Sequence, residues 1–416
     1  MQVRGCSVRP KLLRAVSFLI VIVLSTGFVS GCSSDDPTTI KKQSLTDAGR
    51  SKLTPDASID AKQVALKAKA SKEDSIPVTL SSSKQPIRAI YVTSHVANGS
   101  RIRQLIDLVK NTELNAMVVD VNSGISLVAP TRDRHNTPDY TTLTWSERKS
   151  SRHFRQMIKQ LKDEGIYLIA RIVTFKNPEL SKAMPSWAIK RKDGSVWRDR
   201  NGTSWIDPYR QEAWEYPLAL AEKVVQLGFD EVQYDYVRFP ENEANVDKIV
   251  SYENDEGWNK SEAIRKFLHR ANVRAHKYGA RVSADVFGMV GSSDDDMGIG
   301  QKWDSIAREV DIISPMVYPS HYSEGMWGID HPDHSPGVIV AHALEDAVKR
   351  NRRLNGKGVD TAKVRPWLQG FTAGWVHPHQ KYNEKEIREQ IVAARKAGIN
   401  SYMIWNSSSS YPKFTT

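Results

Sequence analysis

Cysteine is nearly absent from this sequence, which contains only Cys6 and Cys32 among its 416 residues. Two thiols cannot form a disulfide framework or a thiolate zinc site. Cys32 lies at the end of a predicted N-terminal targeting signal, so we expect no cysteine-based catalysis. The chemistry must come from other side chains.

Motifs for nucleotide and acyl chemistry are missing as well. No Gly-x-Gly-x-x-Gly follows the first predicted strand, and neither a P-loop nor a Gly-x-Ser-x-Gly elbow occurs. No zinc-finger or RNP-like motif is present, and no Lys/Arg block is interleaved with aromatic residues. The formal net charge of +11 favours anionic surfaces or polymers. These observations give little support to nucleic-acid binding, NTP hydrolysis or acyl transfer.

The N-terminus has the composition of an export signal. Four basic residues precede an apolar run at residues 15–29, which is too short for a comfortable transmembrane helix. The run ends in Val-Ser-Gly-Cys at residues 29–32, which resembles a bacterial lipobox. This resemblance implies cleavage before Cys32 and lipidation of that residue. The alternative is an uncleaved signal anchor.

The composition divides the chain into three parts. We expect a lipoprotein signal peptide at residues 1–31, a lipidated Cys32 with a disordered tether at 32–85, and one globular domain at 86–416. The tether is rich in Ser, Lys, Asp and Ala and has almost no aromatic residues, so it cannot bury enough apolar surface to fold. Ser33, rather than Asp, follows the lipobox, which favours the outer membrane or cell surface.

The globular part alternates β-favouring runs with amphipathic helical patterns. Strands are predicted at residues 88–93, 116–122, 167–173, 231–239, 281–288, 311–318, 365–371 and 401–406. Helices are predicted at residues 101–111, 151–164, 210–227, 260–277, 341–353 and 384–397. This order predicts an α/β fold, a (β/α)8 TIM barrel. Few residues follow the last strand, so a segment before the first strand could replace the eighth helix.

Polar and aromatic residues gather at the carboxyl ends of these strands, where TIM barrels carry their active sites. Two carboxylates, Asp235 and Asp285, are our candidate catalytic residues. The candidate substrate-binding residues at or near strand ends are Tyr91, His95, Asp120, Arg171, Tyr234, Arg238, Tyr318, Gln369, Trp405 and Asn406. Each could instead be a polar residue that only satisfies its neighbours within the barrel.

Two carboxyl groups on neighbouring strands suit glycoside hydrolysis, in which one is protonated and the other ionised. Asp235 lies near Arg238 in sequence, so we expect it to be the ionised base or nucleophile, oriented by Arg238. Asp285 lies between Ala284 and Val286, a more apolar setting that suits the acid. The alternatives are an Asp235–Arg238 pair that only fixes the barrel rim and an Asp285 that only bonds within the barrel.

The connection after the third predicted strand, residues 174–208, is long and contains Trp187, Trp197 and Trp205. Long loops on the catalytic face of a barrel are often functional. We interpret Trp197 and Trp205 as part of a wall that packs on sugar rings. The alternative is a small core beneath the loop.

Histidines at 331, 334, 377 and 379 lie in irregular segments without metal-ligand spacing. We therefore expect no metal and no other cofactor.

Several blocks of sequence match one family in the same order. They lie at residues 167–173, 228–240, 283–288, 299–301, 313–320, 365–369 and 404–406. Over residues 86–411 the chain resembles the DUF4015 family of glycosyl hydrolase domains. The resemblance implies a glycosidase-like TIM barrel that acts on polysaccharide, and it supports Asp235, Arg238 and Asp285 as site residues. Three positions depart from the expected pattern: Asn122, where Lys is usual, and Asn177 and Gly370, where acids are usual.

We therefore expect an exported, lipid-anchored glycoside hydrolase that cleaves a cell-envelope or extracellular polysaccharide. Its partners would be that polysaccharide and, through Cys32, a membrane. Gly370 in place of an acid favours one alternative, an anchored polysaccharide-binding barrel without activity. A second alternative is a metal-dependent polysaccharide deacetylase that uses the region of His331 and His334.

Overall fold

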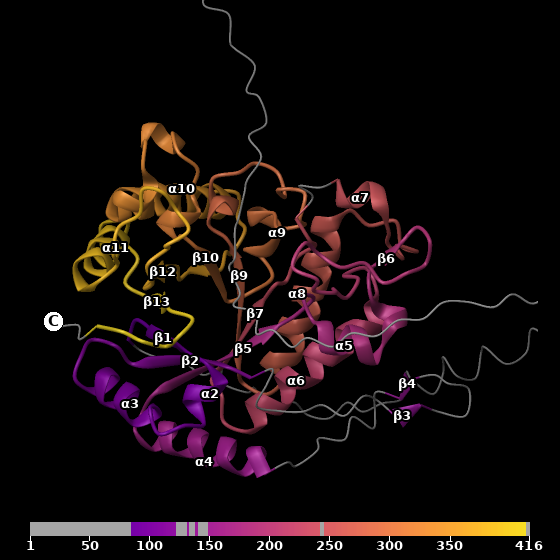
Figure 1. Cartoon of the computed structure of the whole chain (residues 1–416), viewed down its shortest axis with the longest axis horizontal. Coiled ribbons are helices and arrows are strands. Elements are labelled where there is room, and N and C mark those ends of the chain that lie inside the picture. Colours follow the sequence, from indigo (N-terminus) through magenta and orange to yellow (C-terminus); the bar gives the residue numbers. More distant parts are fainter. Residues whose placement is uncertain (1–84, 122–130, 133–137, 140–148, 242–244, 413–416) are drawn as a thin grey trace, which may run out of the picture. The chain divides into compact units, whose positions relative to one another are not determined.

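The computed structural model describes residues 85–121, 131–132, 138–139, 149–241 and 245–412 (Figure 1). Its main sheet is parallel and closes on itself, because β10 pairs with β9 as well as with β12. The barrel strands are β1 (Arg88–Val92), β2 (Ala116–Asp120), β5 (Tyr167–Val173), β7 (Glu231–Asp235), β9 (Arg281–Phe287), β10 (Ile312–Met316), β12 (Trp367–Gln369) and β13 (Tyr402–Trp405). The predicted (β/α)8 TIM barrel is confirmed.

Helices surround this barrel (Figure 1). They are α2 (Ser94–Ala97), α3 (Ile102–Lys110), α4 (Lys149–Asp163), α5 (Pro178–Ala183), α6 (Glu215–Gln226), α7 (Val246–Ile249), α8 (Lys260–His276), α9 (Trp303–Ile306), α10 (Pro336–Asn355) and α11 (Glu384–Lys396). Among the described residues, none after β13 is helical. A segment before β1 that could replace the missing helix would lie outside the described residues.

The connections between the barrel strands and helices contain short helices and strands. Single-turn 3-10 helices are η2 (Pro185–Trp187), η3 (Gln211–Trp214), η4 (Gly288–Gly291), η5 (Pro319–His321), η6 (Met326–Gly328) and η7 (Pro332–His334). The remaining strands are the antiparallel pairs β3 (Thr131–Arg132) with β4 (Pro138–Asp139) and β6 (Lys190–Arg191) with β8 (Val250–Ser251), and β11 (Lys363–Val364), which pairs in parallel with the beginning of β10.

All barrel strands except β5 are shorter than predicted, and two of them, β7 and β12, end or begin where they do for identifiable reasons. β7 ends at Asp235 because Tyr236 takes a left-handed backbone conformation, with φ of 50°, that cannot continue a strand. β12 begins only after Pro366, which has no N–H to donate to a neighbouring strand. Conversely, α10 begins five residues earlier than predicted, because Pro336 is well suited to the first helical turn.

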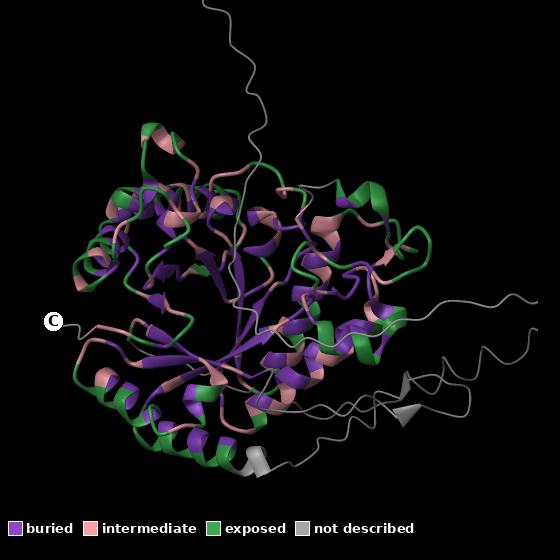
Figure 2. Ribbon diagram, in the orientation of Figure 1, coloured by how far each residue is buried: buried purple, intermediate pink, exposed green. Residues whose placement is uncertain are grey.

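The barrel strands are buried along most of their length (Figure 2), and successive side chains point alternately to the outer and the inner face of the barrel. Apolar residues on the outer face pack against the helices in the larger core. A second, smaller cluster fills the barrel and contains Ile87, Ala89, Tyr91, Ala116, Val118, Ile169, Tyr318, Trp367 and Met403. The inward positions are therefore partly apolar and partly polar, and the polar ones determine what the barrel can do.

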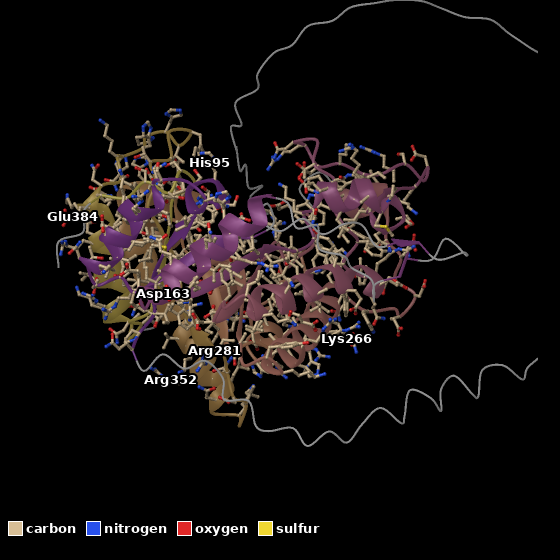
Figure 3. The ribbon with its side chains drawn as sticks, turned by 90° about the horizontal axis from the view of Figure 1, so that it is seen from below. His95, Asp163, Lys266, Arg281, Arg352 and Glu384 are labelled. Atoms are coloured by element: carbon tan, nitrogen blue, oxygen red, sulfur yellow. The ribbon has the colours of Figure 1, made fainter. Side chains whose placement is uncertain are left out.

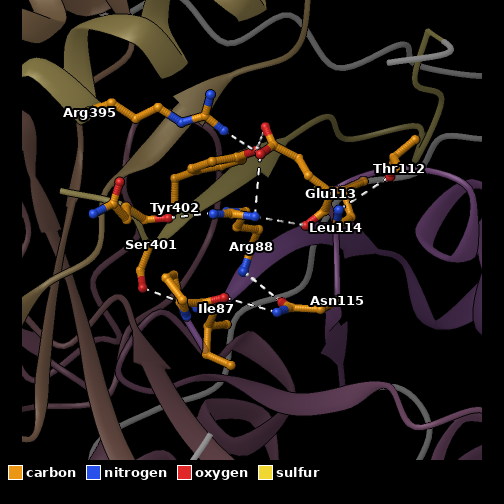
Figure 4. Close-up of polar contacts among 11 residues, drawn as sticks. Ile87, Arg88, Thr112, Glu113, Leu114, Asn115, Arg395, Ser401 and Tyr402 are labelled. Carbon is orange, nitrogen blue, oxygen red and sulfur yellow. Dashed lines mark hydrogen bonds and ion pairs between the residues drawn. The ribbon is translucent and has the colours of Figure 1, made fainter. Parts of the chain in front are cut away.

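A polar cluster joins the beginnings of β1, β2 and β13 (Figure 4). Glu113 accepts a hydrogen bond from the Tyr402 hydroxyl at 2.7 Å and forms ion pairs with Arg88 and Arg395. The backbone N–H of Arg88 donates to the Asn115 side chain at 2.9 Å. These contacts satisfy polar groups at the amino-terminal end of the barrel, opposite the candidate site.

The barrel interior also holds a buried ion pair between Glu231 and Arg365. Both side chains are at most 3% exposed. Glu231 accepts further hydrogen bonds from the Ser283 hydroxyl at 2.6 Å and the Tyr167 hydroxyl at 3.2 Å. This network joins strands β5, β7, β9 and the entry to β12 from within.

Glu231→Gln should lower the free energy of unfolding by about 3–5 kcal/mol, because it leaves the Arg365 cation buried without its counter-charge. The double substitution Glu231→Leu with Arg365→Met should recover most of that loss, since no buried charge then remains. Urea denaturation of the three proteins measures this difference. A double variant as unstable as the single one would show that the attraction between Glu231 and Arg365 stabilises the fold by more than the desolvation of the two charges destabilises it.

Candidate active site

One guanidinium, that of Arg171 on β5, connects two carboxylates at the carboxyl end of the barrel. Its Nε and Nη2 both donate to Oδ2 of Asp235 on β7, at 3.0 and 2.5 Å. Its Nη1 donates to Oδ2 of Asp120 on β2, at 2.7 Å. Burial acts against the charge of Arg171, but Asp235 and then Asp120 raise its pKa well above the ordinary value. The three side chains form one buried, charge-assisted unit.

The backbone fixes the second oxygen of Asp235. The N–H of Tyr236 donates to Asp235 Oδ1 at 2.6 Å, and the Asp235 carbonyl accepts from the N–H of Thr174 at 2.8 Å. The left-handed conformation of Tyr236 is uncommon for a residue with a side chain, and it lies directly after the carboxylate that this N–H holds. Asp235 is therefore held from both sides.

Asp285 on β9 lies beside Asp235. Tyr234 pairs with Ala284 between β7 and β9, so Asp235 and Asp285 follow at the next position on adjacent strands and point inward together. Oδ1 of Asp285 accepts from the indole N–H of Trp367 at 2.8 Å. Burial raises the pKa of Asp285 well above its usual range, and the nearby charge of Asp235 raises it further. Asp285 is thus suited to carry a proton that it can donate.

Aromatic rings enclose the Arg171 unit. Tyr91 and Trp405 lie with ring centroids 4.0 Å apart, and the guanidinium carbon of Arg171 is 5.6 and 5.1 Å from them. The Tyr91 hydroxyl donates to Asp120 at 3.3 Å. Tyr318 belongs to the same interior cluster as Tyr91, and burial raises its pKa, so its hydroxyl stays protonated. The structure therefore gathers Tyr91, Trp405 and Tyr318 around the carboxylates, as predicted.

Arg238 does not orient Asp235, so that prediction was wrong. Its Nη2 donates to Glu241 at 2.8 Å and its Nη1 to the carbonyl of Phe239 at 2.9 Å. Arg238 lies beyond the end of β7, where its guanidinium is directed over the Phe287 ring at 4.6 Å. Arg171 makes the contact with Asp235 that we had expected of Arg238.

Four other predicted binding residues lie away from the carboxylates or are occupied by structural contacts. His95 is exposed on α2 (Figure 3). Tyr234 points outward from β7, and its ring lies 5.3 Å from Phe267 of α8. Asn406 forms a turn in which it accepts from Ser408 and donates to the carbonyl of Gly370. The outward direction of Tyr234 follows from the alternation of side chains along a strand, because its neighbour Asp235 points inward.

Gln369 is the fourth of these residues. It is fully buried, and its side chain accepts from the N–H and hydroxyl of Ser320 at 3.0 and 2.9 Å. It also donates to Asp333 and to the carbonyl of Phe371. Gln369 therefore connects the loops after β10 and β12 and offers no free group to a ligand.

The tryptophans of the β5–α6 connection form a small core. Trp187, Trp197 and Trp205 are 3%, 4% and 1% exposed, and the Trp205 indole donates to Asp199 at 3.1 Å. The prediction that Trp197 and Trp205 form a sugar-packing wall was wrong, because the loop folds back over these rings. Their size and burial stabilise the loop instead.

One residue of the site was missed from the sequence, namely Trp367. It lies two positions before the predicted Gln369, so both face inward, and its indole reaches Asp285. The unusual Gly370 also has a structural reason. A Cβ there would lie 2.6 Å from Ile404 Cγ2 and 2.9 Å from the Trp405 carbonyl oxygen. No acid fits at 370 in this structure without movement of β13.

Asn177, the second unusual position, has a structural role. It caps α5 by accepting a hydrogen bond from the N–H of Leu180 at 3.0 Å. Asn122, the third, lies outside the described residues.

The structure does not support the metal alternative. Among the residues that the structure describes, no three His, Cys, Asp or Glu side chains come together as metal ligands. His331 and His334 have ring centroids 6.0 Å apart on the surface.

The chain matches a family of known proteins over most of its globular part. The family described as "DUF4015: Putative glycosyl hydrolase domain" matches residues 89–411, which include every strand of the barrel except the first residue of β1. No curated protein is significantly similar to this chain in sequence.

Matches among solved structures include a hypothetical protein from Ruminiclostridium thermocellum ATCC 27405, 30% identical over 50% of this chain and 98% of that one, with a TM-score of 0.38. The glycoside hydrolase domain of PgaB (BpsB) from Bordetella bronchiseptica is 13% identical over 78% of this chain and 95% of that one, with a TM-score of 0.50. The α-galactosidase TtGalA from Thermus thermophilus is 13% identical over 80% and 60%, with a TM-score of 0.46. The likeness to PgaB is one of fold.

Arg171→Met should lower the free energy of unfolding by about 3–5 kcal/mol, because it leaves Asp120 and Asp235 without their shared counter-charge. Arg238→Met is a matched control, since it removes an equally buried guanidinium whose partner, Glu241, has a side chain 34% exposed. Water can solvate Glu241, so the control should lose less. Equal losses in urea denaturation would mean that the Arg171 bridge adds no stability of its own.

Proposed function

Because the chain belongs to the DUF4015 family of glycosyl hydrolase domains, we propose that it hydrolyses a polysaccharide with Asp235 and Asp285 as its catalytic pair. The observation that carries this proposal is the asymmetry between the two carboxyl groups. Asp235 forms an ion pair with Arg171, whereas Asp285 has a raised pKa and an indole donor as its neighbour. Paired-carboxylate glycosidases need this combination of an anion and an acid.

Each residue then has a chemical role. Asp285 protonates the glycosidic oxygen as the bond to the leaving group breaks. Asp235 acts on the anomeric carbon directly as a nucleophile, or through a water molecule as a base. Arg171 and the Tyr236 N–H hold Asp235 in position. The pH dependence follows in sign: activity falls as pH rises through the raised pKa of Asp285, because the acid then loses its proton.

The two alternatives lack a supporting observation in the structure. The binding-only barrel was suggested by Gly370, but the approach of β13 to this residue accounts for the absence of a side chain. The deacetylase needs metal ligands near His331 and His334, and the described residues bring no such set together. Neither is favoured over hydrolysis.

Asp285→Asn and Asp235→Asn should each lower product release from a degradable polysaccharide by about 10²–10⁴-fold, since each removes one group that acts in the transition state. The measurement is release of reducing ends from a panel of cell-envelope and extracellular polysaccharides. Chelators should leave the rate unchanged.

Asp207→Asn provides the matched control. Asp207 is also buried, and burial raises its pKa to about 7, but it lies outside the barrel in the β5–α6 connection. This variant should keep its activity. Full activity in Asp235→Asn would remove that residue from the mechanism, and inactivation by chelators would favour the deacetylase.

We also propose that the chain is exported and anchored through lipid on Cys32. The support is the lipobox-like Val-Ser-Gly-Cys after a basic and apolar leader. No helix among the described residues is long and apolar enough to span a bilayer. A lipid anchor with a tether would hold the barrel near envelope polysaccharide, and Ser33 favours the outer membrane or cell surface.

Cys32→Ser should shift the protein from the membrane fraction to the soluble or unprocessed fraction, because the lipobox-like segment then has no thiol to receive lipid. Detergent phase partitioning and the mass of the mature N-terminus measure this directly. Cys6→Ser, which lies before the apolar run, should leave membrane attachment unchanged. A Cys32→Ser protein that stays on the membrane and keeps its N-terminus would indicate a signal anchor.

A further inference from the structure

An exposed tryptophan lies beyond β12, within a series of aromatic rings that leads from the catalytic end of the barrel. Trp375 is 39% exposed and is the only tryptophan among the exposed large apolar side chains of the described residues. Its ring stacks against Phe371, with centroids 6.0 Å apart and an angle of 21° between planes. Phe371 in turn lies 5.6 Å from Tyr318. Tyr318 packs in the interior cluster with Trp367, the indole donor to Asp285.

His321 completes this series of rings. Its imidazole centroid is 5.3 Å from Tyr318, 6.2 Å from Phe371 and 6.3 Å from Trp375. Burial lowers the pKa of His321 to about 4, so the ring is neutral above that pH. We call these four residues the aromatic track. None of them carries a charge at neutral pH, so the track presents ring faces and edges rather than ions.

Buried polar contacts hold the two loops that carry the track. Gln369 accepts from the N–H of Ser320, next to His321, and donates to the carbonyl of Phe371. It also donates to Asp333, which is 2% exposed and accepts from the N–H of Gln380. The loops after β10 and β12 are thereby tied to each other. The rings are positioned before any ligand arrives, which lowers the entropic cost of binding.

We propose that the aromatic track binds a polysaccharide chain that extends outward from the catalytic carboxylates, with uncharged sugar rings packed on Trp375 and Phe371. The inference rests on the proposed function, because the track is continuous with the site at Asp285. The apolar faces of pyranose rings bury area against aromatic rings, and a half-exposed tryptophan offers such area at little conformational cost. Only a ligand of several sugar units can contact Trp375 and the carboxylates together, so long chains should be preferred over short ones.

The test compares Trp375→Ala with Trp375→Tyr and with Tyr278→Ala. Tyr278 is 44% exposed and lies between α8 and β9, at the amino-terminal end of the barrel, so it controls for the loss of a surface aromatic ring. Mobility is measured in native gels that contain galactomannan, xyloglucan or glycol chitin. Reducing-end release from the same polymers, and from their purified oligosaccharides, is measured in parallel.

Trp375→Ala should weaken retardation in the gels roughly tenfold, whereas Trp375→Tyr keeps most of it and Tyr278→Ala keeps all of it. The loss in product release should grow with the length of the substrate. Absence of retardation of the unmodified protein by all three polymers, or equal retardation of the alanine variants, would overturn the inference.

The two assays separate this inference from the proposed function. Product release with unchanged retardation of Trp375→Ala would overturn the aromatic track and leave hydrolysis standing. Retardation that depends on Trp375, without product release from any polymer, would support the track and count against hydrolysis.

Discussion

The site depends on one guanidinium shared between two carboxylates. Arg171 holds Asp235 and Asp120 within a largely buried space, where two unpaired carboxylates would repel each other and lose their hydration. With Asp235 fixed in this ion pair, burial and the adjacent charge together raise the pKa of Asp285. The position of Arg171 therefore determines that Asp235 is the anion and Asp285 the acid. A second arginine in the barrel interior, Arg365, neutralises Glu231, which lies at the beginning of β7.

Much of the fold could be predicted from the sequence because strand and helix periods differ and because the strands are buried on both faces. The strand at Tyr167–Val173 was predicted with its observed bounds, and each other barrel strand was located. The errors lie at strand ends. Tyr236 ends β7 through its left-handed backbone conformation, which cannot be predicted from the presence of a tyrosine. Contacts formed only in the folded barrel decide such endpoints.

The candidate site could be predicted in part from the positions of the strands. Carboxylates near the ends of neighbouring parallel strands must converge, so Asp235 and Asp285 were placed together from the sequence. Which arginine reaches Asp235 depends on side-chain direction beyond the strand, and sequence proximity wrongly favoured Arg238 over Arg171. Whether a tryptophan faces a ligand or a core depends on how its loop folds, so Trp205, buried, and Trp375, exposed, could not be told apart in advance.

The most direct measurement is a titration of the Asp285 carboxyl by infrared difference spectroscopy, with Asp285→Asn used to assign its band. In the unmodified protein the band of the protonated acid should persist well above the pH at which an ordinary aspartate ionises, about 4. In Asp235→Asn it should titrate at lower pH, because the adjacent negative charge is gone while burial remains. An Asp285 that ionises near its ordinary pKa, or whose titration is unaffected by Asp235→Asn, would contradict the assignment of the two carboxyl groups as an acid beside an anion.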